Sequence, residues 1–248
     1  SLSLLNPLSI LDKGYSIVRT KEEFEKIKNG KVWGIFTNAD MSYEIDRDAK
    51  EPSLSEMTKK AIEILSKNPN GFVLMVEGSK VDWAAHANNP ATIVREIKAF
   101  DDAVGIALSY AKLNNKTLLI SSSDHGNSGI SIGNKSTSGN YPQIPLDEFV
   151  STIRNVNMGE EKLSKLIFED ISKTEELITK HLGFKPTKEE ISRINEVVNT
   201  FDKTKTDYLR MRNSNTKADE IRYELGRMIS ERSKIGFTTT GHTGEDVP

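Results

Sequence analysis

The stretch Phe72-Val-Leu-Met-Val-Glu-Gly-Ser-Lys-Val-Asp-Trp-Ala-Ala-His86 joins an unbroken apolar run to a group of polar side chains. The run follows the turn Asn68-Pro-Asn-Gly71, and a short apolar run after such a turn is typical of a strand covered on both faces. Glu77 comes directly after this predicted strand, where an unpaired carboxylate is costly to bury. We therefore expect Glu77 to face a cation, which is either a metal ion or a buried lysine or arginine.

Predicted strands and helices alternate along the first half of the chain. Besides 72–76, strands are predicted at 15–19, 32–36 and 117–120, and helices begin at Thr20-Lys-Glu-Glu23, Ser53-Leu-Ser-Glu56 and Asn89-Pro90. Strands separated by helices at this spacing imply right-handed crossovers and a largely parallel sheet. We therefore predict an α/β fold, a three-layer sandwich with a largely parallel central sheet.

From about Asp147 to Lys234 the pattern changes, because strands give way to charged amphipathic helices. Apolar residues recur there at helical spacing in three stripes: Leu163, Leu166, Ile167 and Ile171; Ile191, Ile194, Val197, Val198 and Phe201; and Ile221, Leu225, Met228 and Ile229. The second stripe follows the capping box Thr187-Lys-Glu-Glu190. We expect one α/β domain over residues 1–248, with a helical insertion at about 147–234 that packs on itself and on the sheet.

Composition excludes several classes of function. The 34 basic residues nearly cancel the 36 acidic ones and are interspersed with them, so no nucleic-acid partner is expected. The longest apolar run, 72–76, is far below the roughly 20 residues that span a bilayer, so no membrane span is expected. The absence of cysteine excludes thiolate metal sites without choosing a compartment. The chain opens with Ser-Leu-Ser-Leu-Leu, so we expect a piece of a longer polypeptide, truncated at both ends.

Two other clusters carry residues that bind metals. Asp124 and His125 follow the predicted strand 117–120, and ligands of open parallel sheets gather outside such strand ends. Asp82 and His86 are four residues apart, so one helical turn would place both on the same face. A metal ion would use that arrangement, although a surface pair that only hydrogen-bonds would have the same spacing.

The two remaining histidines have different surroundings. His242 lies in the loop Thr239-Thr-Gly-His-Thr-Gly244, so it is either exposed to solvent or held by a group such as a metal. His181 precedes Gly183 at the predicted end of a helix, where an imidazole bonds the last carbonyls, and we assign it to structure.

Together these stretches resemble the metal-binding half of the alkaline phosphatase family. The matching stretches are Leu74–Gly78, Val81–Asp82, His86–Asn89, Phe100–Val104, Ser123–His125 and Gly241–Pro248, and the similarity extends over essentially the whole chain. The resemblance implies a phosphate monoester hydrolase with two zinc ions, one magnesium ion and a phosphoserine intermediate. It also implies a homodimer that is exported to the periplasm or secreted.

The resemblance assigns roles by position. Glu77 is similar to the magnesium ligand, Asp82, His86 and His242 to the ligands of the first zinc, and Asp124 and His125 to ligands of the second zinc. Three protein ligands leave the first zinc an open position, as in catalytic sites. Two such ions roughly 4 Å apart can clamp the attacking and leaving oxygens of a phosphoryl transfer.

The chain departs from the family in one respect. The nucleophilic serine, a metal-bridging aspartate, the other magnesium ligands and the phosphate-binding arginine have no match in it. Ser121, Ser122 and Ser123 belong to the predicted strand before Asp124, and Thr243 follows a ligand. We therefore expect the parent protein to hydrolyse phosphate monoesters at alkaline pH and this chain alone to be inactive.

Two other interpretations stay open. The first is a phosphomutase or phosphodiesterase of the same superfamily, although the spacing of Asp82 and His86 and the tail after His242 favour the monoesterase. The second is a non-catalytic metal-binding module whose working surface is the helical insertion.

Overall fold

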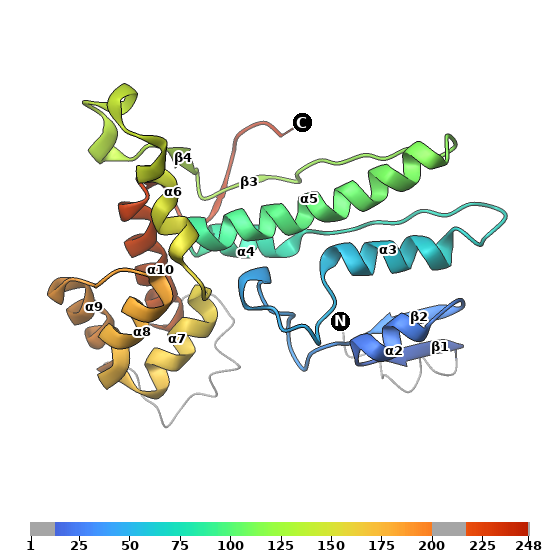
Figure 1. Ribbon diagram of the computed structural model, residues 1–248, viewed down its shortest axis with the longest axis horizontal. Coiled ribbons are helices and arrows are strands. Elements are labelled where there is room, and N and C mark those ends of the chain that lie inside the picture. The colour runs from blue at the N-terminus through green and yellow to red at the C-terminus, as the bar shows by residue number, and fades with distance from the viewer. Residues whose placement is uncertain (1–12, 200–216, 248) are drawn as a thin grey trace. The chain divides into compact units, whose positions relative to one another are not determined.

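The computed structural model describes residues 13–199 and 217–247, so Phe201 and Pro248 lie outside the described residues. Its internal contacts divide the chain into two compact units. The first unit contains Ser1–Gly78 and Ile97–Ser121, and the second contains Ser79–Glu96 and Ser122–Pro248. Figure 1 shows the elements of both units, coloured along the chain. Over the described ranges, no helix combines the length and the apolar character that crossing a membrane requires.

The first unit contains a small parallel ladder. Strands β1 (Tyr15–Val18) and β2 (Lys31–Gly34) pair in parallel, with Tyr15 opposite Lys31. Helix α2 (Lys21–Lys26) connects them and begins at the predicted capping box, in which Thr20 and Glu23 each accept a backbone hydrogen bond. The predicted strands at 15–19 and 32–36 are therefore confirmed, with shifts of one or two residues at their ends.

Helix α3 (Leu54–Leu65) is hydrogen-bonded to α2 and to the residue that follows it. It also begins at a predicted capping box, formed by Ser53 and Glu56. Glu56 accepts from Lys21 at 2.6 Å, and Lys60 donates to the backbone carbonyls of Glu25 at 3.2 Å and Ile27 at 3.4 Å. A 3-10 turn, η2 (Glu44–Asp46), precedes α3.

The third predicted helix is α5 (Pro90–Leu113), which begins in the second unit and ends in the first. Its N-cap is Asn89, as predicted, because the Asn89 side-chain oxygen accepts from the backbone N–H groups of Ala91 at 3.0 Å and Thr92 at 3.3 Å. A helix of this length needs such a cap, because its first backbone N–H groups have no partner within the helix.

Two predicted strands are not formed. Segments 72–76 and 117–120 belong to no β-ladder among the described residues. In both, half-buried and exposed side chains alternate, so the backbone runs extended without a neighbouring strand. A strand needs a partner for its main-chain hydrogen bonds, which an apolar sequence pattern cannot supply.

The second unit combines two short antiparallel ladders with helices. The ladders pair β3 (Gly126–Asn127) with β6 (His242–Thr243) and β4 (Ser131–Ile132) with β5 (Ile235–Gly236). The helices are α4 (Ser79–His86), α6 (Leu146–Asn155), α7 (Glu160–Glu169), α8 (Thr174–Leu182), α9 (Lys188–Asn199) and α10 (Lys217–Arg232), with 3-10 turns at Lys135–Thr137, Tyr141–Gln143 and Ile171–Lys173.

The core of the second unit lies around α10, which packs against α7, α9 and α6. Members of the three predicted stripes fill it, because Leu163, Ile167, Ile194, Ile221, Leu225, Met228 and Ile229 are fully buried. Each such side chain stabilises the fold by roughly 1.5–3 kcal/mol relative to an exposed one. Helices α6 to α10 therefore share one buried core over the described residues of 147–234.

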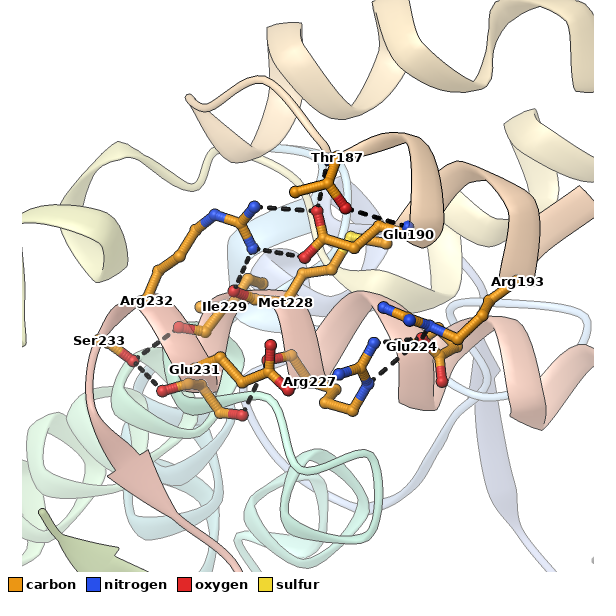
Figure 2. A network of polar contacts seen from close by, with 11 residues as sticks. Thr187, Glu190, Arg193, Glu224, Arg227, Met228, Ile229, Glu231, Arg232 and Ser233 are labelled. Carbon is orange, nitrogen blue, oxygen red and sulfur yellow. Dashed lines mark hydrogen bonds and ion pairs between the residues drawn. The ribbon is translucent and has the colours of Figure 1, made fainter. Parts of the chain in front are cut away.

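Ion pairs connect α9 and α10 (Figure 2). The two guanidinium nitrogens of Arg232 contact the two carboxylate oxygens of Glu190 at 2.7 and 2.9 Å. Glu190 also accepts from the backbone N–H of Thr187 at 2.8 Å, which completes the predicted capping box of α9. Nearby, Glu224 accepts from Arg193 at 2.9 Å and from Arg227 at 2.8 Å.

Candidate metal centre

Helix α4 presents Asp82 and His86 on one face, as their spacing predicted. One carboxylate oxygen of Asp82, Oδ2, lies 3.3 Å from Nε2 of His86. The side chains are 32% and 38% exposed, so the pair lies at the surface rather than in the core. A ligand from solvent can therefore reach both.

The β3–β6 ladder brings together residues that are more than a hundred positions apart in the sequence. Gly126 pairs with Thr243 and Asn127 with His242, so the ladder places His125 next to His242. The two imidazole rings stack, with ring centroids 3.7 Å apart and planes 26° apart. The buried Ser128, at φ 59°, extends the ladder by donating its backbone N–H to the Gly241 carbonyl at 2.8 Å.

Asp82 joins the helix to the ladder. Its Oδ1 lies 3.4 Å from Nε2 of His242, and the side-chain amide of Asn127 donates to the same Oδ1 at 2.6 Å and to the Asp82 carbonyl at 3.1 Å. As a result, Asp82, His125 and His242 each offer a ligand atom, and these atoms all lie within 4.8 Å of one another. His86 lies at the edge of this cluster, with its ring centroid 5.1 Å from that of His242.

Backbone carbonyls orient two of the imidazoles. Nδ1 of His86 lies 2.5 Å from the Thr240 carbonyl oxygen, and Nδ1 of His125 lies 3.1 Å from the Gly126 carbonyl oxygen. A carbonyl oxygen only accepts, so each Nδ1 acts as the donor and Nε2 is the ring nitrogen that faces the cluster. Metal-binding histidines use this arrangement, in which the second ring nitrogen donates to a carbonyl. The donor set of imidazole nitrogens and a carboxylate suits a divalent transition metal such as zinc.

The two other predicted ligands lie outside this close group. The Asp124 side chain is 87% exposed, and its Oδ2 lies 3.5 Å from Nε2 of the neighbouring His125. Glu77 belongs to the first unit and is exposed there. The resemblance assigned His125 to the second zinc, whereas the structure groups it with Asp82 and His242, two ligands implied for the first.

His181, which the sequence assigned to structure, is bonded within the helical region. Its Nδ1 lies 2.7 Å from the side-chain oxygen of Asn157, and its backbone carbonyl accepts from the Asn157 N–H at 2.9 Å. Burial, together with the charges of Lys180 and Lys162, lowers the pKa of His181. The imidazole is therefore neutral at pH 7 and does not complement the helix dipole as a cation.

The helical region holds the corner that follows His86. Glu160 of α7 is 1% exposed, and its Oε2 accepts from Asn89 at 2.7 Å and from Thr92 at 2.8 Å. On α10, a Cβ at Gly226 would overlap the carbonyl oxygen of Ala87. Two helices of the predicted insertion thus fix the turn between α4 and α5.

Sequence reasoning missed several of these supporting groups. Asn127, the Thr240 carbonyl, Glu160 and Gly226 were not predicted to support the cluster. Asn127 directly follows the His125-Gly126 pair, and that position is the signal that could have identified it. The others act through tertiary contacts that a single sequence does not reveal.

Comparison with known proteins gives one consistent result. Residues 7–248 match the sequence model of the alkaline phosphatase family. Alkaline phosphatase 4 of Bacillus subtilis is 35% identical over 95% of this chain and 46% of its own length. The repressible alkaline phosphatase of Saccharomyces cerevisiae is 35% identical over 86% of this chain and 38% of its own length. This chain therefore spans about half the length, or less, of these relatives.

Solved structures agree in fold. A cold-active alkaline phosphatase from a Shewanella species superposes with a TM-score of 0.79 at 27% identity, over 99% of this chain and 56% of that one. The Thermus thermophilus alkaline phosphatase gives a TM-score of 0.79 at 22% identity, over 97% of this chain and 51% of that one. The likeness to these structures supports the predicted α/β class.

Proposed function

Because the chain belongs to the alkaline phosphatase family, we propose that it supplies the metal-binding part of an enzyme that hydrolyses phosphate monoesters. The observation that carries this proposal is the convergence of Asp82, His125 and His242 in the second unit. Their mixed imidazole and carboxylate donors suit zinc better than magnesium. The fold we propose for the whole enzyme is the three-layer sandwich with a largely parallel central sheet.

In this proposal Asp82 has the central place. Its two carboxylate oxygens lie toward different imidazoles, Oδ2 toward His86 and Oδ1 toward His242. We assign these three residues to one zinc ion, Asp124 and His125 to a second, and Glu77 to magnesium. Bound metal would supply Lewis-acid stabilisation of the phosphoryl oxygens and would activate the nucleophile.

In this proposal the residues of this chain bind the metal and orient its ligands, but they do not supply the nucleophile. Asn127 fixes the Asp82 carboxylate, and carbonyl oxygens hold Nε2 of His86 and His125 free to bind. The serine of the phosphoserine intermediate belongs to a part of the enzyme that this chain does not contain. The isolated chain therefore binds metal without turnover. Homodimerisation and export to the periplasm or exterior are part of the same proposal.

A fusion protein tests this function. In it, this chain replaces the matched region of alkaline phosphatase 4 of Bacillus subtilis, and activity is measured with p-nitrophenyl phosphate and zinc at alkaline pH. We expect the fusion to release nitrophenol and the isolated chain to release none. Asp82→Ala should lower kcat/KM of the fusion on the order of 100-fold or more, because the carboxylate binds metal directly.

Asp102→Ala is the matched control, because Asp102 is an exposed carboxylate on α5 that pairs with Lys98 on the same helix. It should leave kcat/KM unchanged. Bis-p-nitrophenyl phosphate, a diester, should be hydrolysed much more slowly than the monoester. Turnover by the isolated chain, or a fusion whose activity does not depend on Asp82, would contradict the proposal.

A further inference from the structure

The second unit contains a pocket of about 610 Å³ that is separate from the candidate metal centre. Residues of three segments line it, 131–141, 223–231 of α10 and 235–238, together with Asn88. Its described lining includes none of the predicted metal ligands. Small-molecule sites have volumes of roughly 300–1,000 Å³, so the pocket has room for a ligand of that kind.

Several hydroxyl groups along the pocket have already donated their proton. Thr137, Ser131 and Ser230 each donate to a backbone carbonyl, at 2.8, 3.0 and 3.0 Å. A hydroxyl has one proton and two lone pairs, so toward a ligand these oxygens can only accept. A molecule that fits them therefore carries several hydrogen-bond donors.

Asn88 adds an acceptor that has no partner. The residue is 5% exposed, and its side-chain oxygen accepts no hydrogen bond from any of the described residues. A buried acceptor without a partner costs free energy, and folded proteins normally satisfy such groups with protein, water or ligand donors. Because Asn88 lines the pocket, a donor on a bound molecule would satisfy this oxygen.

The charges along the pocket are balanced. Arg227 donates to Glu224 at 2.8 Å and also pairs with Glu231, which lines the pocket as well (Figure 2). Lys135 is the other cation of the described lining, and it is exposed to solvent. No net charge therefore attracts an anion or a cation to this place, so the donors of a fitting ligand belong to uncharged groups.

Two tyrosine rings give the pocket an apolar surface. Tyr141 packs on Phe149 with ring centroids 6.0 Å apart, and a Cβ at Gly133 would come within 3.3 Å of the Tyr141 ring. Tyr223 lines the pocket from α10 and is 38% exposed. A tyrosine offers an apolar ring face and a polar hydroxyl, and a sugar ring complements both, with its C–H face and its hydroxyl groups.

We propose that this pocket is a second binding site of the protein and that it takes a small uncharged sugar. The oxygens of Thr137, Ser230 and Asn88 accept hydrogen bonds from the sugar hydroxyls, and the ring of Tyr223 covers a C–H face of the sugar. The site goes beyond the proposed phosphatase function and does not depend on it, because none of these residues is assigned to a metal.

Saturation-transfer NMR with maltose tests the site in the isolated chain and in the fusion with alkaline phosphatase 4 of Bacillus subtilis described above. We expect saturable transfer to maltose in both proteins, without added metal. In the isotope-labelled isolated chain, maltose should shift the amide signals of 131–141 and 235–238, which line the pocket. Inorganic phosphate and putrescine, the charged probes, should leave those signals in place.

Tyr223→Ala should raise the dissociation constant for maltose by about 10-fold, because it removes the ring that covers the sugar. Tyr223→Phe keeps the ring and should bind maltose nearly as well as the wild type. Tyr15→Ala is the matched control, because Tyr15 is 36% exposed on β1, against 38% for Tyr223. It should leave the dissociation constant unchanged, and the melting temperature of each variant checks that it is folded.

Four results would overturn the proposal. The first is the absence of saturable transfer from the isolated chain to maltose. The second is a shift of the pocket amides by phosphate or putrescine as large as the shift by maltose. The third is an equal affinity for maltose in Tyr223→Ala and Tyr15→Ala. The fourth is loss of maltose binding in the fusion, because the rest of the enzyme would then cover the pocket. An inactive fusion that binds maltose would refute the proposed phosphatase activity and leave the sugar site intact.

Discussion

Asp82 determines whether the polar cluster can act as a metal centre. It is in contact with His86 on its own helix and with His242 on the β3–β6 ladder. Three imidazoles without this carboxylate would give a more weakly binding and more positively charged site once a divalent ion is bound. Asn127 supports Asp82, because its side-chain amide donates a hydrogen bond to Oδ1 of Asp82 at 2.6 Å.

Asn127→Ala should therefore weaken metal binding without removing a ligand. Partners that orient a ligand are each worth about 10–100-fold in metal affinity. We expect the zinc dissociation constant of the isolated chain, measured by competition with a chelating dye, to rise within that range. Asn134→Ala is the control, because the Asn134 side chain accepts from the backbone of Ser136 instead. Equal affinities of the Asn127 variant and the wild type would exclude this supporting role.

At the residue scale, the sequence predicted the contact between Asp82 and His86 but not the one between His125 and His242. The four-residue spacing of Asp82 and His86 predicted their shared helix face, which the structure has. The proximity of His125 and His242 depends on a two-residue ladder between distant segments, and no periodicity in the sequence encodes such pairing. The loop around His242 indicated a possible metal ligand, and the family resemblance assigned it to the same zinc as Asp82 and His86.

At the scale of elements, the α9–α10 contact depends on a buried carboxylate. Glu190 is 4% exposed and accepts hydrogen bonds from two guanidinium nitrogens of Arg232 (Figure 2). The guanidinium of Arg232 also lies over the ring of Phe184. Burial alone would raise the pKa of Glu190, but the hydrogen bonds from Arg232 and Thr187 outweigh it, and the pKa is lowered. The pair therefore stabilises the fold in the ionised state of the carboxylate.

Arg232→Met should lower the free energy of unfolding at pH 7 by about 3 kcal/mol, because it leaves a buried carboxylate unpaired. Arg154→Met, which removes an exposed ion pair with Asp147, should cost no more than about 0.5 kcal/mol. The folded-state pKa of Glu190 is depressed, so the stabilisation is present above its ordinary pKa of 4.5 and is lost as pH falls below it. Urea unfolding at several pH values checks this. If Arg232→Met lowered the free energy of unfolding equally at all pH values, the ionised pair would not be its cause.

Glu160 has the opposite dependence on pH. Burial raises its pKa, although Thr92 and Asn89 donate hydrogen bonds to it. The folded state therefore binds this proton more tightly than the unfolded state does, and the contribution of Glu160 to stability falls as pH rises above 4.5. Glu160→Gln stays neutral, so wild type should lose stability relative to the variant between pH 5 and pH 8. Parallel stability curves for the two proteins would show that Glu160 does not titrate in this way.

The helical elements were easier to predict than the strands. The capping boxes at Thr20, Ser53 and Thr187 mark helix starts through contacts within four residues, and all three were confirmed. The predicted strands 72–76 and 117–120 have the right composition, but strand formation needs hydrogen-bond partners from elsewhere. Helices carry their hydrogen bonds within themselves, and this difference explains the unequal success.

At the scale of the whole molecule, the apolar side chains of the second unit are better buried than those of the first. The helical core around α10 is buried, and two of its helices hold the turn that follows His86. Helices α7 and α10 therefore support the candidate metal centre, whereas a rival interpretation made the helical region a separate working surface. The first unit leaves apolar side chains exposed in the two segments 72–76 and 117–120.

The central claim is that Asp82, His86 and His242 bind one zinc ion and that His125, beside them, binds a second. X-ray absorption at the zinc edge of the zinc-loaded isolated chain tests it most directly. We predict one or more imidazole nitrogens and a carboxylate oxygen at about 2.0–2.2 Å, and the loss of an imidazole in His242→Ala. His181→Ala, which alters the histidine of the helical region, should leave the spectrum unchanged. A zinc shell without imidazole, or one that is identical in the His242 variant, would contradict the account.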